Sequence, residues 1–286
     1  MIVSIIGLGL IGGSLSIDMR EKGVAENIIG VDNNRKNAND ALRIGLVDEI
    51  LDLENAVATA DLVIIAIPVD QTIKLLPAVM DKIKSTSAVM DVGSTKEGIC
   101  KIADVHSKRE NFVATHPIAG TENFGPLGAI PKLFKGKPVI ICDKNKSSEI
   151  ALNKVESLYK AIGMEIINMN SHEHDLHAAY VSHLSHISSF TLGLTVLEIE
   201  KSEETIFELA GSGFASTVRL AKSSPDMWAP ILEQNSHHLS KALGAYIEKL
   251  SVFKELIEKN DTTKIHDLIK EANDIRRILD GKNLTL

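Results

Sequence analysis

A glycine-rich turn near the N-terminus constrains the fold of this chain more than any other feature. It reads Gly7-Leu8-Gly9-Leu10-Ile11-Gly12, follows the apolar run Ile2–Ile6 and opens an amphipathic stretch, Leu10–Lys22. In this setting the first glycine permits a tight turn, the second lets the backbone approach a pyrophosphate, and the third permits close packing of a helix on a strand. The order of strand, glycines and helix therefore predicts a dinucleotide-binding unit.

An acidic residue after the next strand-like run supports this prediction. Asp32 follows Ile28–Val31 and lies 20 residues beyond Gly12, where a carboxylate accepts hydrogen bonds from the adenosine ribose. A carboxylate there repels a 2′-phosphate and favours NAD over NADP, although Arg35 lies close in sequence. We expect the following residues to contact the cofactor: Gly7, Gly9, Leu10, Ile11, Gly12, Asp32, Pro68 and Ser94.

The first 168 residues alternate short apolar runs with amphipathic stretches. This pattern predicts repeated strand–helix units over a mostly parallel sheet, because most of the runs are continuous and β-branched. The expected strands are Ile2–Ile6, Ile28–Val31, Leu62–Ile67, Ala88–Val92, Phe112–Ala114, Pro138–Cys142 and Glu165–Ile167. The expected helices are Leu10–Lys22, Arg35–Ile44, Gln71–Ile83, Lys96–Val105 and Ser147–Ile162.

Residues 169–286 show helical periodicity instead. We expect helices at Glu173–Leu197, Met227–Ile257 and Thr263–Leu279. The middle one would span about 30 residues, against an average of about 11–12. A helix of that length favours packing across a two-fold axis over a monomeric bundle. The sequence thus predicts a Rossmann-type α/β domain, residues 1–168, followed by an all-α domain, residues 169–286, that forms a homodimer.

Composition restricts the partners and the compartment. A net charge of −7 without a basic run argues against binding to nucleic acid or to an anionic membrane. No apolar stretch approaches the ~20 residues that span a bilayer, and the N-terminus lacks the basic region of a signal peptide. We therefore expect a cytoplasmic protein.

Metal binding is not expected either. The two cysteines, Cys100 and Cys142, provide neither a disulfide framework nor a cysteine-based zinc site. Five histidines lie between His172 and His186, but their spacing is not His-Glu-x-x-His.

Two polar segments follow neighbouring strand-like runs. His116 ends the run that begins at Phe112, and Ser94 and Thr95 follow the run Ala88–Val92. The carboxyl edge of an open α/β sheet is where ligands bind, so we expect Ser94 and His116 to lie together there and His116 to be catalytic. Ser94 or Thr95 is also expected to cap the next helix.

Several motifs resemble the prephenate dehydrogenase family, in order over nearly the whole chain. They are the glycine turn, Asp91-Val92-Gly93-Ser94-Thr95-Lys96, His116-Pro117-Ile118-Ala119-Gly120-Thr121-Glu122, Ser182-His183-Leu184-Ser185-His186, and Gly211-Ser212-Gly213-Phe214 with Arg219. The resemblance implies oxidative decarboxylation of prephenate to 4-hydroxyphenylpyruvate with NAD. It further implies that His116 is the base and Ser94 its orienting partner, and that the substrate is bound by Arg219, His186, Glu122 and Thr121. Trp228 belongs either to the core or to the substrate pocket.

The chain departs from the family pattern at two places, and three other functions stay open. Ser185 stands where many members have proline, and residues 215–218 are neutral where many are charged. One alternative is an arogenate dehydrogenase. A second is a β-hydroxyacid-type dehydrogenase, for which a lysine in the helical domain is expected and the His116 loop stays unexplained. The third, a non-catalytic NAD-sensing protein, would not need Ser94, His116 and Arg219 together.

Overall fold

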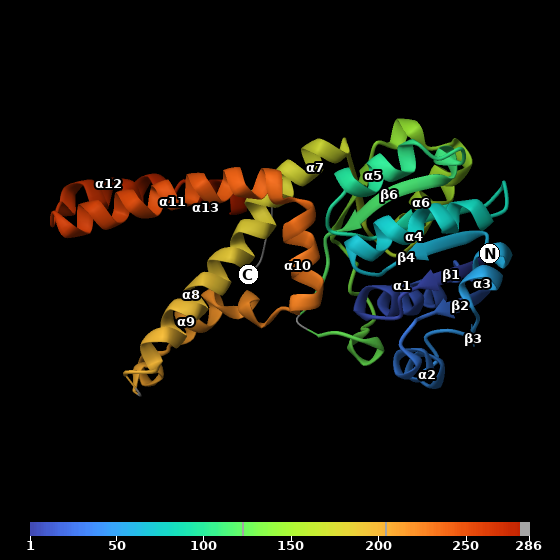
Figure 1. Cartoon of the computed structure of the whole chain (residues 1–286), viewed down its shortest axis with the longest axis horizontal. Coiled ribbons are helices and arrows are strands. Elements are labelled where there is room, and N and C mark those ends of the chain that lie inside the picture. Colours follow the sequence, from blue (N-terminus) through green and yellow to red (C-terminus); the bar gives the residue numbers. More distant parts are fainter. Residues whose placement is uncertain (122, 204, 281–286) are drawn as a thin grey trace. The chain divides into compact units, whose positions relative to one another are not determined.

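A computed structural model describes residues 1–121, 123–203 and 205–280 of the chain (Figure 1). Contacts divide the chain into two compact units, Met1–Leu239 and Ser240–Leu286. The boundary that the sequence predicts at residue 168 is a different division and stays a prediction. Within the described residues, no helix combines the length and the apolar character needed to cross a membrane.

One eight-stranded sheet organises the first unit. Its strands follow the order β3-β2-β1-β4-β5-β6-β7-β8, and neighbours are parallel except for the antiparallel pair β6 and β7. The predicted mostly parallel sheet is therefore confirmed. The strands are β1 (Ile2–Ile6), β2 (Asn27–Val31), β3 (Glu49–Ile50), β4 (Leu62–Ile65), β5 (Ala88–Asp91), β6 (Phe112–Pro117), β7 (Pro138–Cys142) and β8 (Glu165–Met169).

Both faces of the sheet are covered, which explains why the strands read as continuous apolar runs. In β4, Leu62 and Ile64 join one buried cluster, whereas Val63 and Ile65 join another, because successive side chains of a strand point to opposite faces. Residues of α1 (Leu10–Glu21) and α6 (Glu149–Ala161) contribute to the first cluster. Residues of α4 (Val69–Lys82), α5 (Glu97–Asp104) and α10 (Pro225–Gln234) contribute to the second.

Short elements were missed by the sequence pattern. The two-residue strand β3 and the helix α3 (Leu53–Thr59) were not predicted, because a segment of two to seven residues shows too little periodicity. The predicted helix at Arg35–Ile44 is α2 (Arg35–Arg43). β6 continues past the predicted Ala114 to Pro117, because its pairing with β7 extends through His116.

The predicted long helix from Met227 to Ile257 is wrong. The structure has two helices there, α10 and α11 (Ser236–Glu258), separated by Asn235. Asn235 has φ −105° and ψ 22°, outside α-helical geometry, and its side-chain amide hydrogen-bonds elsewhere in the fold, at Asp175. The length of this helix therefore gives no support to a dimer.

The other helices predicted for residues 169–286 are also divided. Residues 171–200 form α7 (Ser171–Ala178), a π-helical turn at Ala179–His183, and α8 (Leu184–Glu200). Then come α9 (Ser212–Thr217) and a 3₁₀ turn at Arg219–Lys222. The second unit contains most of α11, together with α12 (Thr262–Ala272) and α13 (Ile275–Asp280).

Candidate active site

The glycine turn joins β1 to α1 with the geometry of a phosphate-binding turn. Gly7 has φ +96°, and a Cβ there would lie 2.3 Å from the carbonyl oxygen of Ala66. A Cβ on Gly12 would lie 2.1 Å from the carbonyl oxygen of Gly7, so the helix could not pack this closely with any side chain at residue 12. Gly9, in contrast, faces open space, with no atom within 4 Å of its would-be Cβ.

The start of α1 is free to receive an anion. Its N-cap residue is Gly9, and no side chain caps the helix. The first N–H groups of a helix carry a partial positive charge and bind phosphate when no side chain satisfies them. Leu10 and Ile11 form the first turn and are half-buried. These features fit a dinucleotide phosphate group, as the sequence predicts.

Asp32 lies directly beside this turn. One carboxylate oxygen, Oδ2, accepts a hydrogen bond from the Leu8 amide at 3.0 Å, and the other, Oδ1, accepts from the Asn34 amide at 2.8 Å. These contacts hold the carboxylate next to the glycine turn, where a ribose would lie. Pro68, the N-cap of α4, is exposed just beyond β4, the strand next to β1 in the sheet. The residues present therefore fit NAD.

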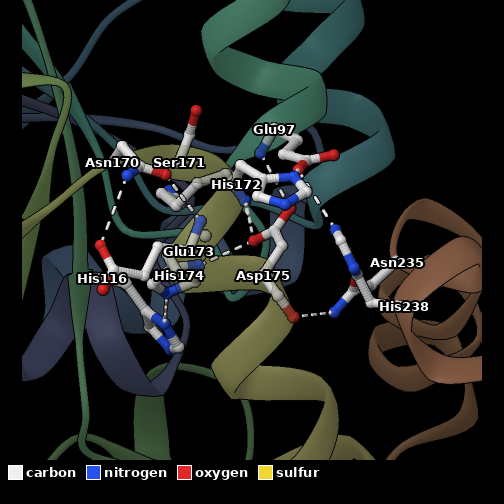
Figure 2. A network of polar contacts seen from close by, with 12 residues as sticks. Glu97, His116, Asn170, Ser171, His172, Glu173, His174, Asp175, Asn235 and His238 are labelled. Carbon is white, nitrogen blue, oxygen red and sulfur yellow. Dashed lines mark hydrogen bonds and ion pairs between the residues drawn. The ribbon is translucent and has the colours of Figure 1, made fainter. Parts of the chain in front are cut away.

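His116 belongs to a chain of three polar side chains (Figure 2). Its Nδ1 lies 2.8 Å from Nε2 of His174, and Nδ1 of His174 lies 2.7 Å from Oδ1 of Asp175. His174 and Asp175 are 3% and 1% exposed, whereas His116 is half-buried. We call these three hydrogen-bonded side chains, His116, His174 and Asp175, the histidine relay.

The relay determines which nitrogen of His116 can act as a base. A carboxylate only accepts hydrogen bonds, so Nδ1 of a neutral His174 carries the proton that faces Asp175. Its Nε2 then accepts a hydrogen bond from Nδ1–H of His116. The remaining nitrogen of His116, Nε2, is left with a free lone pair and can accept a proton.

The surroundings keep His116 neutral. Burial, the neighbouring His174 and the charge of Lys96 hold the pKa of His116 well below its ordinary value of about 6.5. Burial alone would raise the pKa of Asp175, but hydrogen bonds from His174 and the Glu97 amide hold it below its ordinary value. The relay thus combines a neutral imidazole with an ionised carboxylate.

Asp175 also caps a helix far away in sequence. Its two carboxylate oxygens accept hydrogen bonds from the amides of Lys96 and Glu97, at 2.7 and 2.8 Å, at the start of α5. The predicted capping of this helix by Ser94 or Thr95 is therefore wrong, since no local side chain caps α5. The first amides of a helix stabilise a carboxylate, so α5 helps to keep Asp175 ionised and in place.

A second buried network lies behind His116. The ammonium group of Lys96 pairs with Asp91 and donates a hydrogen bond to the carbonyl oxygen of Thr115 at 2.8 Å. Lys96, Asp91 and Thr115 are 0% exposed, and the Thr115 hydroxyl lies 2.6 Å from that of Tyr159. This network joins β5 to β6 next to His116, so it restrains the strand that carries His116.

His186 lies in an aromatic cluster with Trp228. The two rings are stacked, with centroids 3.5 Å apart and an angle of 24° between their planes. Burial lowers the pKa of His186, the hydrogen bond with the Ser182 carbonyl oxygen opposes this shift, and the charge of Arg219 lowers the pKa further. Trp228 is 7% exposed, and its Nε1 has no hydrogen-bond partner among the described residues. Arg219 itself is exposed.

The remaining predicted residues are less well assembled. Ser94 is half-buried, and within the described residues it makes no hydrogen bond to His116, whose Nδ1 is bonded to His174 instead. Its role as orienting partner stays a prediction. Thr121 is half-buried, and its hydroxyl accepts a hydrogen bond from the Asn123 amide at 3.2 Å. Glu122 lies outside the described residues.

Sequence reasoning missed the partners of His116. His174, Asp175 and Asn235 lie 58, 59 and 119 positions after His116 in the chain. Asn235 donates a hydrogen bond to the Asp175 carbonyl oxygen at 2.7 Å and lies 3.1 Å from Nδ1 of His183. The only local signal is the pair His174-Asp175 within a histidine-rich segment.

Comparison with known families matches both halves of the chain. The family "Prephenate dehydrogenase, nucleotide-binding domain" matches residues 15–168, and "Prephenate dehydrogenase, dimerization domain" matches residues 170–271. A curated prephenate dehydrogenase of Bacillus subtilis is 31% identical over 273 residues, which cover 94% of this chain and 74% of that protein.

Solved structures agree with these matches. The prephenate dehydrogenase of A. aeolicus, in complex with hydroxyphenyl propionate and NAD⁺, superposes with a TM-score of 0.89 at 29% identity and 98% coverage of both chains. An arogenate dehydrogenase of Synechocystis superposes with a TM-score of 0.77 at 28% identity, covering 97% of this chain and 99% of that one.

Proposed function

The chain belongs to the prephenate dehydrogenase family, and we propose that it catalyses the NAD-dependent oxidative decarboxylation of prephenate to 4-hydroxyphenylpyruvate. The family supports an NAD-linked oxidoreductase of tyrosine biosynthesis. The observation that carries the finer proposal is the histidine relay, because it supplies a neutral base with one defined free nitrogen.

The cofactor cradle comprises the glycine turn, the uncapped start of α1 and Asp32. NAD⁺ bound there supplies the acceptor for the hydride that leaves the hydroxyl-bearing carbon of the substrate. The cradle binds the dinucleotide, and the carboxylate of Asp32 selects a free ribose hydroxyl over a 2′-phosphate. We also assign Pro68 and Ser94 to contacts with the cofactor.

His116 accepts the proton of the substrate hydroxyl at Nε2. Positive charge then forms on the imidazole while Nδ1–H remains bonded to His174, and the ionised Asp175 stabilises that charge through His174. Loss of the ring carboxylate as CO₂ makes the ring aromatic and leaves a phenolate oxygen. The proton held by His116 returns to that oxygen, so the base is regenerated within one turnover.

Two carboxylates on prephenate need cationic partners in a chain of net charge −7. We assign Arg219 to one of them, because its exposed guanidinium can bind a carboxylate through two parallel hydrogen bonds. His186, stacked on Trp228, is assigned to the same pocket. Thr121 and Glu122 are assigned to the substrate by the motif that they share with the family.

The organisation of the chain completes the proposal. We propose that the nucleotide-binding domain ends near residue 168 and that the helical domain after it forms a homodimer. The match of residues 170–271 to a dimerization domain supports the dimer. The small molecule bound is prephenate, and the proposal includes neither nucleic acid nor membrane as a partner.

The identity of the substrate is tested by assaying the two candidate substrates separately. Purified protein is assayed for NADH formation at saturating NAD⁺ with prephenate or with arogenate, and kcat/KM is compared. We expect prephenate to be preferred, because Arg219 and His186 provide hydrogen-bond donors to a keto acid.

Three outcomes can be distinguished in this assay. Preference for arogenate would keep the fold, the cofactor and the base but contradict the substrate assignment. Such an outcome has a precedent in the similarity to the Synechocystis arogenate dehydrogenase. Turnover of neither compound by protein that binds NAD⁺ would contradict the reaction itself.

A further inference from the structure

A second histidine cluster lies at the start of α5, outside the relay. It consists of Glu97 from α5, His172 from α7 and His238 from α11 (Figure 2). The Nδ1 of His172 lies 2.5 Å from Oε1 of Glu97, and Nε2 of His238 lies 3.2 Å from the same oxygen. The two imidazole rings lie edge to face, with centroids 4.8 Å apart and an angle of 70° between their planes.

The three ligand atoms lie close together. All of them lie within 4.8 Å of one another. In a tetrahedral zinc site, with bonds of about 2.0–2.1 Å, neighbouring ligand atoms lie about 3.3 Å apart. The 3.2 Å between Nε2 of His238 and Oε1 of Glu97 is close to this value. The 2.5 Å contact between Nδ1 of His172 and the same oxygen would have to lengthen by about 0.8 Å.

The environment permits that adjustment. The side chains of His172 and Glu97 are 69% and 40% exposed, so both can shift, whereas His238 is 5% exposed and provides a fixed ligand. Two imidazoles and one carboxylate are a ligand set that zinc uses with a fourth position left to water. Both cysteines are buried, so no thiolate competes for the ion at this surface.

We propose that Glu97, His172 and His238 bind one Zn²⁺ ion per chain. The site joins three elements that are separate in the sequence, and the ion replaces the hydrogen bonds that now link them. Because the Glu97 amide also donates a hydrogen bond to Asp175, the ion braces α5 and α7 where the relay is anchored. The inference is independent of the proposed reaction.

The experiment uses the full chain, freed of any affinity tag and treated with a chelator. Zn²⁺ alone is titrated at constant pH, and binding is followed by calorimetry and by the melting temperature. The variants are His172→Ala and Glu97→Gln, both at exposed side chains. His177→Ala is the matched control, because this histidine is exposed on the same helix, α7, and is not part of the cluster.

We expect one equivalent of Zn²⁺ to bind to the wild-type protein and to the His177→Ala control and to raise the melting temperature of both by several degrees, about the effect of strong binding to the folded state. Each of the two ligand variants should bind at least about tenfold more weakly. Equal binding by wild-type protein and His172→Ala would overturn the proposal, as would retention of full affinity in Glu97→Gln. If zinc changed neither the heat of titration nor the melting temperature of the wild-type protein, the proposal would be wrong. Glu97, His172 and His238 would then form a hydrogen-bonded cluster without a metal.

Discussion

At the scale of single residues, the sequence indicated His116 as the candidate base, but it did not indicate which side chains contact it. His116 ends a strand-like run, and a histidine at that edge of a dinucleotide-binding sheet is a reasonable catalytic candidate. Which of its nitrogens is free depends on His174 and Asp175, which α7 brings to it. Ser94, the partner expected from the motif, makes no such contact in the described structure.

The relay predicts the effects of two substitutions. His116→Asn removes the base and should lower kcat by about 10²–10⁴-fold, with the affinity for NAD⁺ unchanged. Asp175→Asn turns an N–H toward His174 and so favours the tautomer that leaves Nε2 of His116 protonated. It should lower kcat by about 10²–10⁴-fold with a smaller effect on KM.

Steady-state kinetics with an NAD⁺ titration separates these roles. Because Asp175 also caps α5, the melting temperature and circular dichroism of Asp175→Asn must first show that it is folded. A folded Asp175→Asn variant with wild-type kcat would mean that Asp175 acts only as a helix cap.

The lowered pKa of His116 predicts the pH dependence of the reaction. A base must be deprotonated to act, and the surroundings disfavour protonation of this imidazole. Activity should therefore persist as the pH falls through 6.5, and the acid limb of kcat/KM, which reports the free enzyme, should lie below that value. The measurement is kcat/KM for the substrate from about two pH units below to about 1.5 pH units above an ordinary histidine pKa of about 6.5. An acid limb at or above pH 6.5 would contradict the assignment.

At the scale of elements, the unit β1–turn–α1 was predicted correctly because all of its signals are local. The residues of the strand, the turn and the helix are adjacent in the chain, and Gly12 must leave room for the carbonyl oxygen of Gly7, five residues earlier. Elements whose ends depend on distant contacts were predicted less well. Asn235 interrupts an apolar periodicity that otherwise runs from α10 into α11, and β6 is extended by β7.

Two glycines of the turn should respond to alanine in opposite ways. Gly9→Ala adds a methyl group into open space at negative φ, so the melting temperature should stay unchanged while NAD⁺ binds at least about tenfold more weakly, because the methyl group occupies the path of the pyrophosphate. Gly12→Ala drives a methyl group into the Gly7 carbonyl oxygen and should destabilise the fold by about 1–3 kcal/mol.

Thermal unfolding and NAD⁺ titration of both variants test this pair, each serving as the control for the other. If Gly9→Ala lost stability but bound NAD⁺ normally, the turn would be a packing feature and the cofactor would have to bind elsewhere.

At the scale of the whole molecule, the proposed homodimer needs an apolar surface. Helix α8 carries Leu194 and Leu197, which are 68% and 49% exposed and lie three residues apart on one helix face. Leaving such side chains in water forgoes about 25 cal/mol for each Å² that could be buried. We therefore expect α8 to contribute to the dimer interface.

A double substitution tests that expectation. Leu194→Glu with Leu197→Glu should convert a dimer into a monomer, which light scattering coupled to gel filtration would detect as a halved mass. Val105→Glu is the control, because Val105 is 85% exposed at the end of α5, within the predicted nucleotide-binding domain. Equal masses for the double variant and the wild-type protein would exclude this face of α8 from the interface.

The sequence by itself determined the class of fold, the cofactor cradle and the candidate base, because these depend on residues close together in the chain. Alternating apolar runs specify covered strands, and the spacing from Gly12 to Asp32 specifies one βαβ unit. Tertiary structure alone decided what joins distant segments. It joined His116, His174 and Asp175 by hydrogen bonds and capped α5 with a side chain from α7. It also brought ligand atoms of Glu97, His172 and His238 within 4.8 Å of one another. Hydrogen bonds act over about 3 Å, and periodicity along a chain carries no information about which distant side chains come within that range.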